Sequence, residues 1–472
     1  MRRKRGIAAS AGGALVLAAC AAPDIAPPPV SPPDAPAAYA IAKPGPVSID
    51  LATYWQVLGD PLLDEFVQQA IAENQDLAQS AARVVQAEAS LRAARAGYLP
   101  TVNATGGVGR NVGTNAPDDF NFSVGADAAW EADLFGRVRY GVDASEAELA
   151  AAGYSLADVQ RLIVGQVALA TVRARSNAAQ LAIARDTLAN QEENLQIARW
   201  RNQAGLVSSL DVEQARAQRA QTAATIPSLE AALAANANAI ATLIGEPPGR
   251  TLSALQSNPG VPRPPLLTGT GLPAELLTRR PDIRAAEAAL VADSARIGVA
   301  RAQLLPLVRL TGNLGTGGLG IGSLFDTLTG NLFAGISQLL FDGGRTRAQV
   351  DIAQGAAQGS LAAWRQQVLV ALEEVETASA DLSSGRSRVG LFDEARDAAQ
   401  NAALLARSQY QAGLVDFQTL LTAEQQLLSS RNAVITAETE RATAFVRLTQ
   451  ALGGGWTPAT YPLPVYEVAE TR

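Results

Sequence analysis

Hydrophobic and polar residues alternate along four short stretches of the chain, which predicts β-strands with one apolar and one polar face. The alternation is clearest after Phe120, where apolar side chains occupy every second position as far as Trp130. Strands are predicted near residues 101–110, 120–133, 307–315 and 331–341. In the last stretch Phe333, Leu339 and Leu340 interrupt the pattern. A half-buried soluble sheet and a set of membrane strands both explain such alternation.

The length of these stretches favours membrane strands, because a tilted strand needs ~9–11 residues to cross a bilayer. Four strands cannot close a barrel, since the smallest membrane barrels have about eight, and lipid does not tolerate open sheet edges. If the strands cross a membrane, several copies of the chain must therefore complete one barrel. Asp127 and Glu131 lie on the polar side of their strand. In a barrel they would face the lumen and give it a mild cation preference.

Helical patterns precede and follow each pair of predicted strands. Helices are predicted over residues 60–97, 140–201, 281–302 and 345–410. The first starts with Asp60 as its N-cap and Pro61 at its first position. About 60 residues at ~1.5 Å each make a rod of roughly 90 Å, so the two long helices need packing partners. Apolar residues at three-four spacing within 361–382 and at seven-residue intervals from Leu414 to Ala442 predict coiled-coil packing.

The sequence QAGLV occurs at 203–207 and again at 411–415, and a further helical segment follows each copy. Glycine after a helical pattern ends the helix in a tight turn. Each copy therefore predicts the tip of a helical hairpin, and the chain is duplicated as helix, two strands, helix and helix. A kink is predicted at Pro227 in the first return helix. The predicted repeats span 50–250 and 273–457, with a Pro- and Gly-rich connector at 251–272 and a C-terminal tail at 458–472.

Composition excludes much of the usual catalytic chemistry. The 472-residue chain contains no His and one Cys, and its formal net charge is −7. Catalytic His, disulfides and His- or Cys-based metal sites are therefore excluded or nearly so, and the acidic balance argues against nucleic acid as a partner. A hydrolase is a weak alternative, because no set of nucleophile, base and orienting residue can be assembled without His. We expect no enzyme activity, no cofactor and no metal.

The N-terminus has the features of an export signal. A basic segment precedes a short apolar run, which ends in the sequence Leu17-Ala18-Ala19-Cys20. This sequence resembles the bacterial lipobox, which predicts a signal peptide at 1–19 and acylation of Cys20. The Pro- and Ala-rich segment 20–49 would then be a lipidated tether. Ala21, instead of Asp, after the lipidated cysteine implies sorting to the outer membrane, and several acyl chains on one residue make a stable anchor.

Three further motifs complete the pattern. RRPDIRAAE at 279–287 is followed by IGVARA at 297–302, and ALGGGW stands at 451–456. With the lipobox, the duplicated plan and the two hairpin tips, these motifs resemble the TolC-like outer-membrane efflux family. The resemblance is specifically to its lipoprotein branch, which serves resistance–nodulation–division pumps, and it covers roughly residues 50 to 457.

The resemblance implies a mostly α fold with a transmembrane β-barrel contribution. Three chains of a homotrimer would contribute four strands each to one 12-stranded barrel in the outer membrane, continued by a long α-helical periplasmic tunnel. The protein would be the passive exit duct of a tripartite efflux pump for small molecules such as drugs, with a periplasmic adaptor and an inner-membrane pump as partners. The resemblance places adaptor docking at the hairpin tips, at Gly205, Leu206, Val207, Gly413, Leu414 and Val415.

The resemblance also implies a constriction near the tips, often lined by carboxylates just after the second tip. The matching positions here are the neutral residues Gln418 and Thr422, with the acids Asp416 and Asp211 nearby. This departs from a charged ring and leaves a polar, hydrogen-bonded constriction as the expectation. The alternative function is a lipid-anchored periplasmic helical protein, structural or adaptor in type, without a pore. Insertion of a barrel into the membrane distinguishes the two.

Overall fold

The computed structural model describes residues 36, 38–42, 45–110, 112, 120–256, 260–267 and 269–457. Cys20, the signal segment 1–19 and the tail 458–472 lie outside the described residues. The described chain divides into two compact units. Unit 1 contains Arg83–Gly153 and Ala285–Gln366, and unit 2 contains most of the remainder. Each unit is described by itself below.

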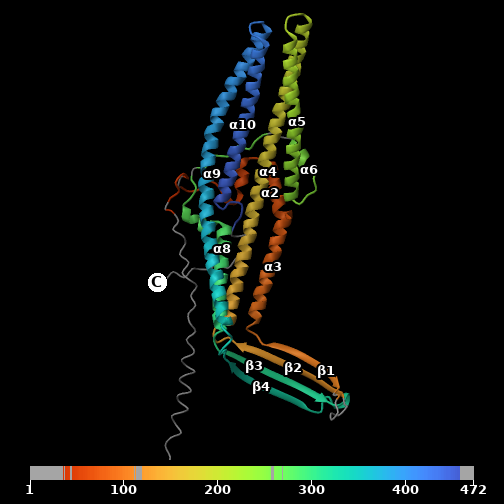
Figure 1. The fold of residues 1–472 in the computed structure, drawn as a ribbon, viewed down its shortest axis with the longest axis vertical. Helices are drawn as coiled ribbons and strands as arrows, with labels where there is room; N and C mark the ends of the chain where they lie inside the picture. The colour runs from red at the N-terminus through yellow and green to blue at the C-terminus, as the bar shows by residue number, and fades with distance from the viewer. Residues whose placement is uncertain are drawn as a thin grey trace, which may run out of the picture. The chain divides into compact units, whose positions relative to one another are not determined.

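Three pairs of helices of equal length occur in the two halves of the chain (Figure 1). The pairs are α3 (Gln75–Ala96) and α8 (Pro281–Ala302) with 22 residues each, α4 (Arg137–Gln203) and α9 (Arg345–Gln411) with 67, and α5 (Ser209–Leu243) and α10 (Phe417–Ala451) with 35. Two strands separate the first helix of each half from the second. The duplicated plan predicted from the sequence is therefore confirmed. None of the helices in the described ranges combines the length and the apolar character needed to cross a membrane.

The shorter elements lie before the strands and between the halves. They are η2 (Leu51–Leu58), α2 (Pro61–Glu73), α6 (Arg250–Gln256), η3 (Pro273–Glu275), α7 (Leu276–Arg279) and η4 (Ile321–Ser323). Asp60 caps α2 as predicted, and its side chain accepts a hydrogen bond from the backbone N–H of Leu62. The helix predicted over 60–97 is divided at Asn74, whose backbone is extended. The Asn74 side chain accepts hydrogen bonds from the N–H groups of Asp76 and Leu77, so it caps the start of α3.

Unit 1 contains a four-stranded antiparallel sheet in the order β1-β2-β3-β4 (Figure 1). The strands are β1 (Thr101–Arg110), β2 (Phe120–Ala132), β3 (Leu307–Gly318) and β4 (Leu328–Ser337). The central pair, β2 with β3, joins the two halves of the chain, and β1 and β4 are the edge strands. Leu339 and Leu340, which interrupt the alternation, lie beyond the end of β4.

The register gives the sheet one apolar and one polar face, because side chains alternate along each strand. Val102, Ala128, Gly312 and Leu332 form one transverse row on the apolar face, and Asn103, Asp127, Asn313 and Asn331 form the neighbouring row on the polar face. The described residues leave this apolar face uncovered. Its large side chains are strongly exposed, with Val102 at 68%, Leu332 at 84% and Ile336 at 74%.

In unit 2 the C-terminal part of α4 and all of α5 form one hairpin, and the C-terminal part of α9 and all of α10 form another (Figure 1). The part of the predicted α9 seam that lies in unit 2 is largely buried, including Val368, Val375 and Leu382. In the seven-residue series on the last helix, Leu421 and Ala442 are buried, whereas Leu414 precedes the helix and is exposed. Helix α5 runs through Pro227 without interruption.

Candidate functional site

The repeated QAGLV sequences form the turns of the two hairpins in unit 2. Gly205 and Gly413 have φ angles of +71° and +74°, a left-handed conformation that glycine adopts without strain. After α4, Leu206 N–H donates to the carbonyl of Arg201 at 2.8 Å and Gly205 N–H donates to that of Asn202 at 2.9 Å. This pair of bonds is a Schellman motif, and the same pair recurs at Gly413 and Leu414. The shared sequence of the two copies is therefore explained by the helix-ending geometry.

The leucine after each glycine is strongly exposed. Leu206 is 74% exposed and Leu414 is 75% exposed. The following valines, Val207 and Val415, are half-buried, and Val415 packs against a buried cluster below the turns. Each tip thus has one exposed leucine, and the hydrogen bonds of the Schellman motif fix the backbone at that residue.

The acids near the tips cap the return helices. Ser208 and Asp211 form a reciprocal capping box at the start of α5. Asp416 is the N-cap of α10 and accepts hydrogen bonds from the N–H and the hydroxyl of Thr419 at 2.8 and 2.5 Å. The hydroxyl bond, together with the backbone bond, lowers the pKa of Asp416. Both carboxylates therefore have a local structural partner.

Gln418 and Thr422 lie one turn apart on α10 and are both exposed. The Thr422 hydroxyl donates to the Gln418 carbonyl at 2.8 Å, and the Gln418 amide donates to that hydroxyl at 3.4 Å. The two side chains thus form one uncharged polar surface, which lies a turn beyond the Asp416 cap.

A buried cluster below the turns joins the two hairpins. It contains Leu195 and Ala198 from α4, Ala215 from α5, Ala406 and Tyr410 from α9, and Phe417, Leu420 and Leu421 from α10. Arg201 crosses between the hairpins, donating to the carbonyls of Tyr410 and Gln411 at 3.2 and 3.1 Å and lying 4.5 Å above the Tyr410 ring. The sequence patterns did not predict this contact, because its partners lie in different halves of the chain.

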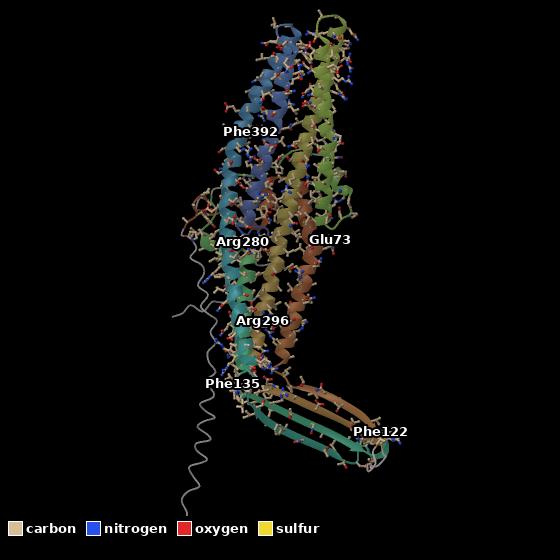
Figure 2. All side chains as sticks on the ribbon, in the orientation of Figure 1. Glu73, Phe122, Phe135, Arg280, Arg296 and Phe392 are labelled. Atoms are coloured by element: carbon tan, nitrogen blue, oxygen red, sulfur yellow. The ribbon has the colours of Figure 1, made fainter. Side chains whose placement is uncertain are left out.

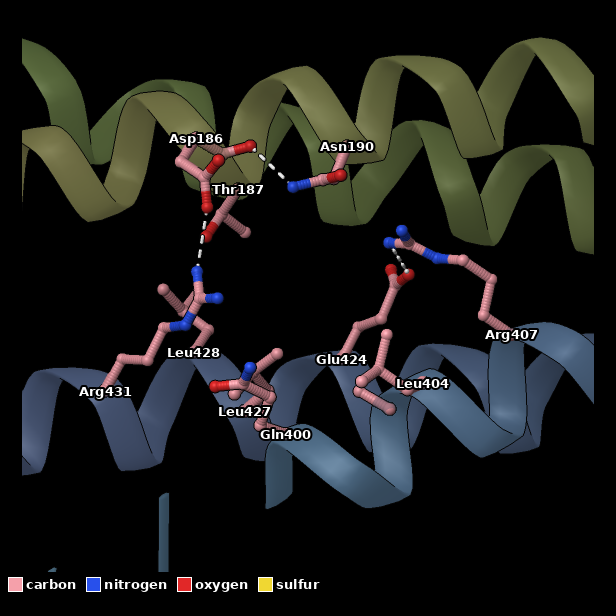
Figure 3. A pocket seen from close by; sticks show the side chains of 11 residues that line it. Asp186, Thr187, Asn190, Gln400, Leu404, Arg407, Glu424, Leu427, Leu428 and Arg431 are labelled. Carbon is pink, nitrogen blue, oxygen red and sulfur yellow. Dashed lines mark hydrogen bonds and ion pairs between the residues drawn. The ribbon is translucent and has the colours of Figure 1, made fainter. Parts of the chain in front are cut away.

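Further from the tips, α4, α9 and α10 line a hollow of about 240 Å³ (Figure 3). Arg431 of α10 forms an ion pair with Asp186 of α4 at 2.8 Å. Glu424 of α10 accepts a hydrogen bond from Asn194 of α4 at 2.7 Å and pairs with Arg407 of α9 at 3.0 Å. These polar side chains thus pair with one another and connect the three helices.

The two acids of the sheet, in unit 1, have different surroundings. Glu131 accepts two hydrogen bonds from Arg137, at 2.7 and 2.6 Å, and stands opposite Arg309 in the register. Asp127 accepts a hydrogen bond from the amide of Asn103 at 3.0 Å and stands opposite Asn313. Among the described residues, no arginine forms an ion pair with Asp127. The negative charge of Asp127 is therefore less compensated than that of Glu131.

Unit 2 also contains a buried ionic cluster whose role the sequence did not reveal, although its arginine belongs to the RRPD motif. The guanidinium of Arg280 (Figure 2) is only 1% exposed. It binds both carboxylate oxygens of Asp282, at 3.1 and 2.6 Å, and reaches Glu374 at 2.6 Å and the carbonyl of Ala451 at 3.0 Å. Burial alone would raise the pKa of Asp282, but the hydrogen bonds and charge of Arg280 outweigh it and lower the pKa.

The terminal GGGW motif packs beside this cluster. Gly455 N–H donates to the carbonyl of Leu51, and a Cβ on Gly454 would come within 2.8 Å of that carbonyl. The indole N–H of Trp456 donates to the Arg279 carbonyl at 3.1 Å. The glycines therefore allow the end of the chain to approach η2 closely.

A last contact, within unit 2, attaches the N-terminal described segment to α9. The Glu376 carboxylate of α9 accepts hydrogen bonds from three successive backbone N–H groups, those of Ala40, Ile41 and Ala42. Tyr39 beside it is buried, and burial, followed by the charge of Glu376, raises its pKa to about 12. We call residues 38–42 the N-terminal strap.

The structure combines helical hairpins that have glycine at their tips with an antiparallel sheet that has one apolar and one polar face. The sequence profile of the family described as outer membrane efflux protein matches residues 66–246 and 272–454. The chain belongs to this family, and it is an outer-membrane efflux channel of the TolC-like type.

Related sequences and solved structures match this chain over most of its length. The chain is 33% identical to the pyoverdine export outer membrane protein OpmQ of Pseudomonas aeruginosa, over 86% of this chain and 88% of OpmQ. It is 30% identical to the cation efflux system protein CusC of Escherichia coli, over 84% and 87% of the two chains. The structure of the outer-membrane channel OprN matches with a TM-score of 0.82 and 33% identity, covering 92% of this chain and 99% of OprN. The open state of the Neisseria gonorrhoeae MtrE channel matches with a TM-score of 0.81 and 27% identity, covering 91% and 98%.

Proposed function

We propose that three copies of the chain form one exit duct, in which their sheets close a 12-stranded barrel in the outer membrane and their helices form a periplasmic tunnel. The observation that carries this proposal is the uncovered apolar face of the sheet. Side chains such as Leu332 and Ile336 are left exposed by the described residues, and a contiguous apolar surface of this kind is suited to lipid. The edge strands β1 and β4 need partners in a bilayer, which neighbouring copies supply.

A pair of substitutions on β4 tests the barrel. Leu332 lies on the apolar face, and Thr329 lies on the polar face. Arginine on the lipid face at the bilayer midplane costs about 2–4 kcal/mol, so Leu332→Arg should reduce the yield of heat-modifiable trimers and of channels in planar bilayers. Thr329→Arg should leave the trimer yield unchanged. Equal yields for both variants would support the alternative, a lipid-anchored periplasmic helical protein without a pore.

The domain organisation proposed here keeps the boundaries predicted from the sequence, including the tether that begins at Cys20. We propose acylation of Cys20 as the anchor in the outer membrane, which the lipobox-like sequence supports. Cys20→Ala should abolish metabolic labelling by palmitate. Persistent labelling of that variant would refute the assignment.

The proposed partner proteins are suggested by the family and by the exposed leucines at the hairpin tips. The exposed Leu206 and Leu414, with their neighbouring glycines and valines, are proposed to dock a periplasmic adaptor, which connects the duct to an inner-membrane pump of the resistance–nodulation–division type. The duct itself performs no chemistry. Related proteins are named for export of pyoverdine, toluene and cations, which supports a duct whose cargo of small molecules is chosen by the pump. A deletion strain should become sensitive to several drugs, dyes or detergents, and normal tolerance to all of them would count against efflux.

A further inference from the structure

The polar face of the sheet contains a hollow of about 190 Å³ whose lining includes a carboxylate and an aromatic ring. Its side chains come from three adjacent strands: Asp127 from β2, Thr311 and Asn313 from β3, and Asn331 and Phe333 from β4. The register explains the grouping, since Asp127, Asn313 and Asn331 are directly aligned and Phe333 is opposite Thr311. The hollow therefore belongs to one protomer and needs no residue from a second copy.

Asp127 supplies this hollow with a negative charge among neutral hydrogen-bonding groups. Asn103 lies on the other side of Asp127 and donates to it, so the carboxylate is flanked by amides across the whole sheet. Glu131, on the same face, is instead held by Arg137 in a paired arrangement. The position of Asp127 thus favours a cationic ligand, whereas the charge of Glu131 is already matched.

Phe333 is the residue that breaks the alternation of β4, and the structure places it on the polar face beside this carboxylate. Its side chain is 62% exposed. A Cβ on Gly335 would come within 2.6 Å of the Phe333 ring, so the glycine leaves space for the ring to lie along the strand. A large exposed aromatic ring on a hydrated face offers its π surface to a ligand, and a cation within about 6 Å of such a ring is attracted to it.

We propose that Asp127, Asn313, Asn331 and Phe333 form a weak binding site for organic cations on the lumen face of the duct. The carboxylate attracts the charge, the ring contacts the apolar or aromatic part of the ligand, and the amides hydrogen-bond to its polar groups. The proposal rests on the proposed function only in taking the polar face as the lumen wall. The duct would retain one class of molecule, amphiphilic organic cations, briefly during export.

Equilibrium dialysis of the purified full-length protein in a non-ionic detergent tests the site with two probes of the same shape and opposite charge. Tetraphenylphosphonium is the cation and tetraphenylborate is the matched anion. An exposed cation–π contact contributes about 0.5–1 kcal/mol, so Phe333→Ala should weaken binding of the cation about two- to fivefold. Asp127→Asn should weaken it by a similar factor and reduce its salt dependence.

Two control variants keep the test specific. Asp326→Asn removes an exposed acid outside the strands, and Phe325→Ala removes a phenylalanine that is 76% exposed outside the strands. Both should bind the cation like the wild type. The inference is overturned if Asp127→Asn and Phe333→Ala bind normally, if tetraphenylborate binds the same site equally well, or if magnesium chloride binds there while the organic cation does not. Single-channel conductance of the same preparation separates the two proposals, because conduction without cation binding refutes the site alone, and binding without conduction refutes the duct alone.

Discussion

The buried guanidinium of Arg280 donates two hydrogen bonds, of 3.1 and 2.6 Å, to the carboxylate of Asp282, two residues later in the chain. The same guanidinium reaches Glu374 and the carbonyl of Ala451. One side chain therefore connects the start of α8 with α9 and the end of α10. Asp282 also accepts a hydrogen bond from Gln367 at 2.7 Å, so the ionic cluster lies at a junction of three helices in unit 2.

Removal of this guanidinium should destabilise unit 2 strongly. Arg280→Leu removes two hydrogen bonds and the nearest counter-charge from the Asp282 carboxylate, and leaves it the ion pair with Arg161 at 3.6 Å. Breaking a buried pair costs about 3–5 kcal/mol, and the pair with Arg161 should keep the loss near the lower end of that range. The adjacent Arg279 is the control, because the side chains of its ion pair with Glu275 are 41% and 39% exposed and solvent-exposed pairs contribute about 0–1 kcal/mol. Thermal unfolding followed by circular dichroism should show a large loss of stability for Arg280→Leu and a small loss of stability for Arg279→Ala. Equal losses would mean that the cluster adds no special stability.

Substitution of the tip glycines by alanine should destabilise the hairpin tips through backbone strain alone. Gly205 and Gly413 have positive φ, and, apart from the adjacent residues of the chain, no described atom lies within 4 Å of a Cβ built on either residue. Gly205→Ala and Gly413→Ala should therefore each cost about 1–2 kcal/mol from the left-handed conformation. Gly355→Ala, within α9 and also without a close neighbour, should instead stabilise its helix by about 0.5–1 kcal/mol. Amide hydrogen exchange measures both effects, and protection that changes in the same direction at all three sites would contradict the strain argument.

The parts of the fold that were predictable from the sequence are those encoded by a local period. Two-residue alternation marked the strands, and the repeated QAGLV marked both tips, because turn geometry depends on adjacent residues. The division at Asn74 was missed because a single amide caps a new helix there. The partners of Arg280 were missed for a different reason: Glu374 and Ala451 lie 94 and 171 residues further along the chain. The candidate constriction and docking residues stay predictions, because the contacts that would define them involve other molecules.

The N-terminal strap should depend on a single carboxylate. Glu376 accepts the N–H groups of Ala40, Ile41 and Ala42, so Glu376→Ala leaves three donors without their acceptor. We expect faster amide exchange at 40–42 and faster proteolysis of the strap. Glu373→Ala, an exposed neighbour on the same helix, should change neither measurement. An unchanged strap in Glu376→Ala would show that the burial of Tyr39 holds it instead.

The start of α10 should weaken in acid. Hydrogen bonds from Thr419 lower the pKa of Asp416 below its ordinary value of 3.8, so the folded state favours the carboxylate. The cap is therefore fully present above pH 3.8 and is lost as the pH falls through the lower folded-state pKa. Exchange of the Thr419 amide, corrected for its intrinsic rate, should lose protection in that acidic range. Asp416→Ala should show the low protection at every pH, and a wild-type profile with no acid-dependent step would contradict the assignment.

The uncharged pair Gln418 and Thr422 provides the test of a polar constriction. Because the two side chains bond to each other and to their own helix, their removal leaves no buried partner unsatisfied and should not unfold the tip. If they narrow the duct, Gln418→Ala with Thr422→Ala widens it, and single-channel conductance in planar bilayers should rise. Thr436→Ala is the matched control, since Thr436 is exposed on the same helix and its hydroxyl makes the same type of bond to Asn432, four residues earlier. Unchanged conductance in the double variant would place the constriction elsewhere. A rise in Thr436→Ala as well would attribute the effect to the helix backbone, because both threonines bond to the preceding turn.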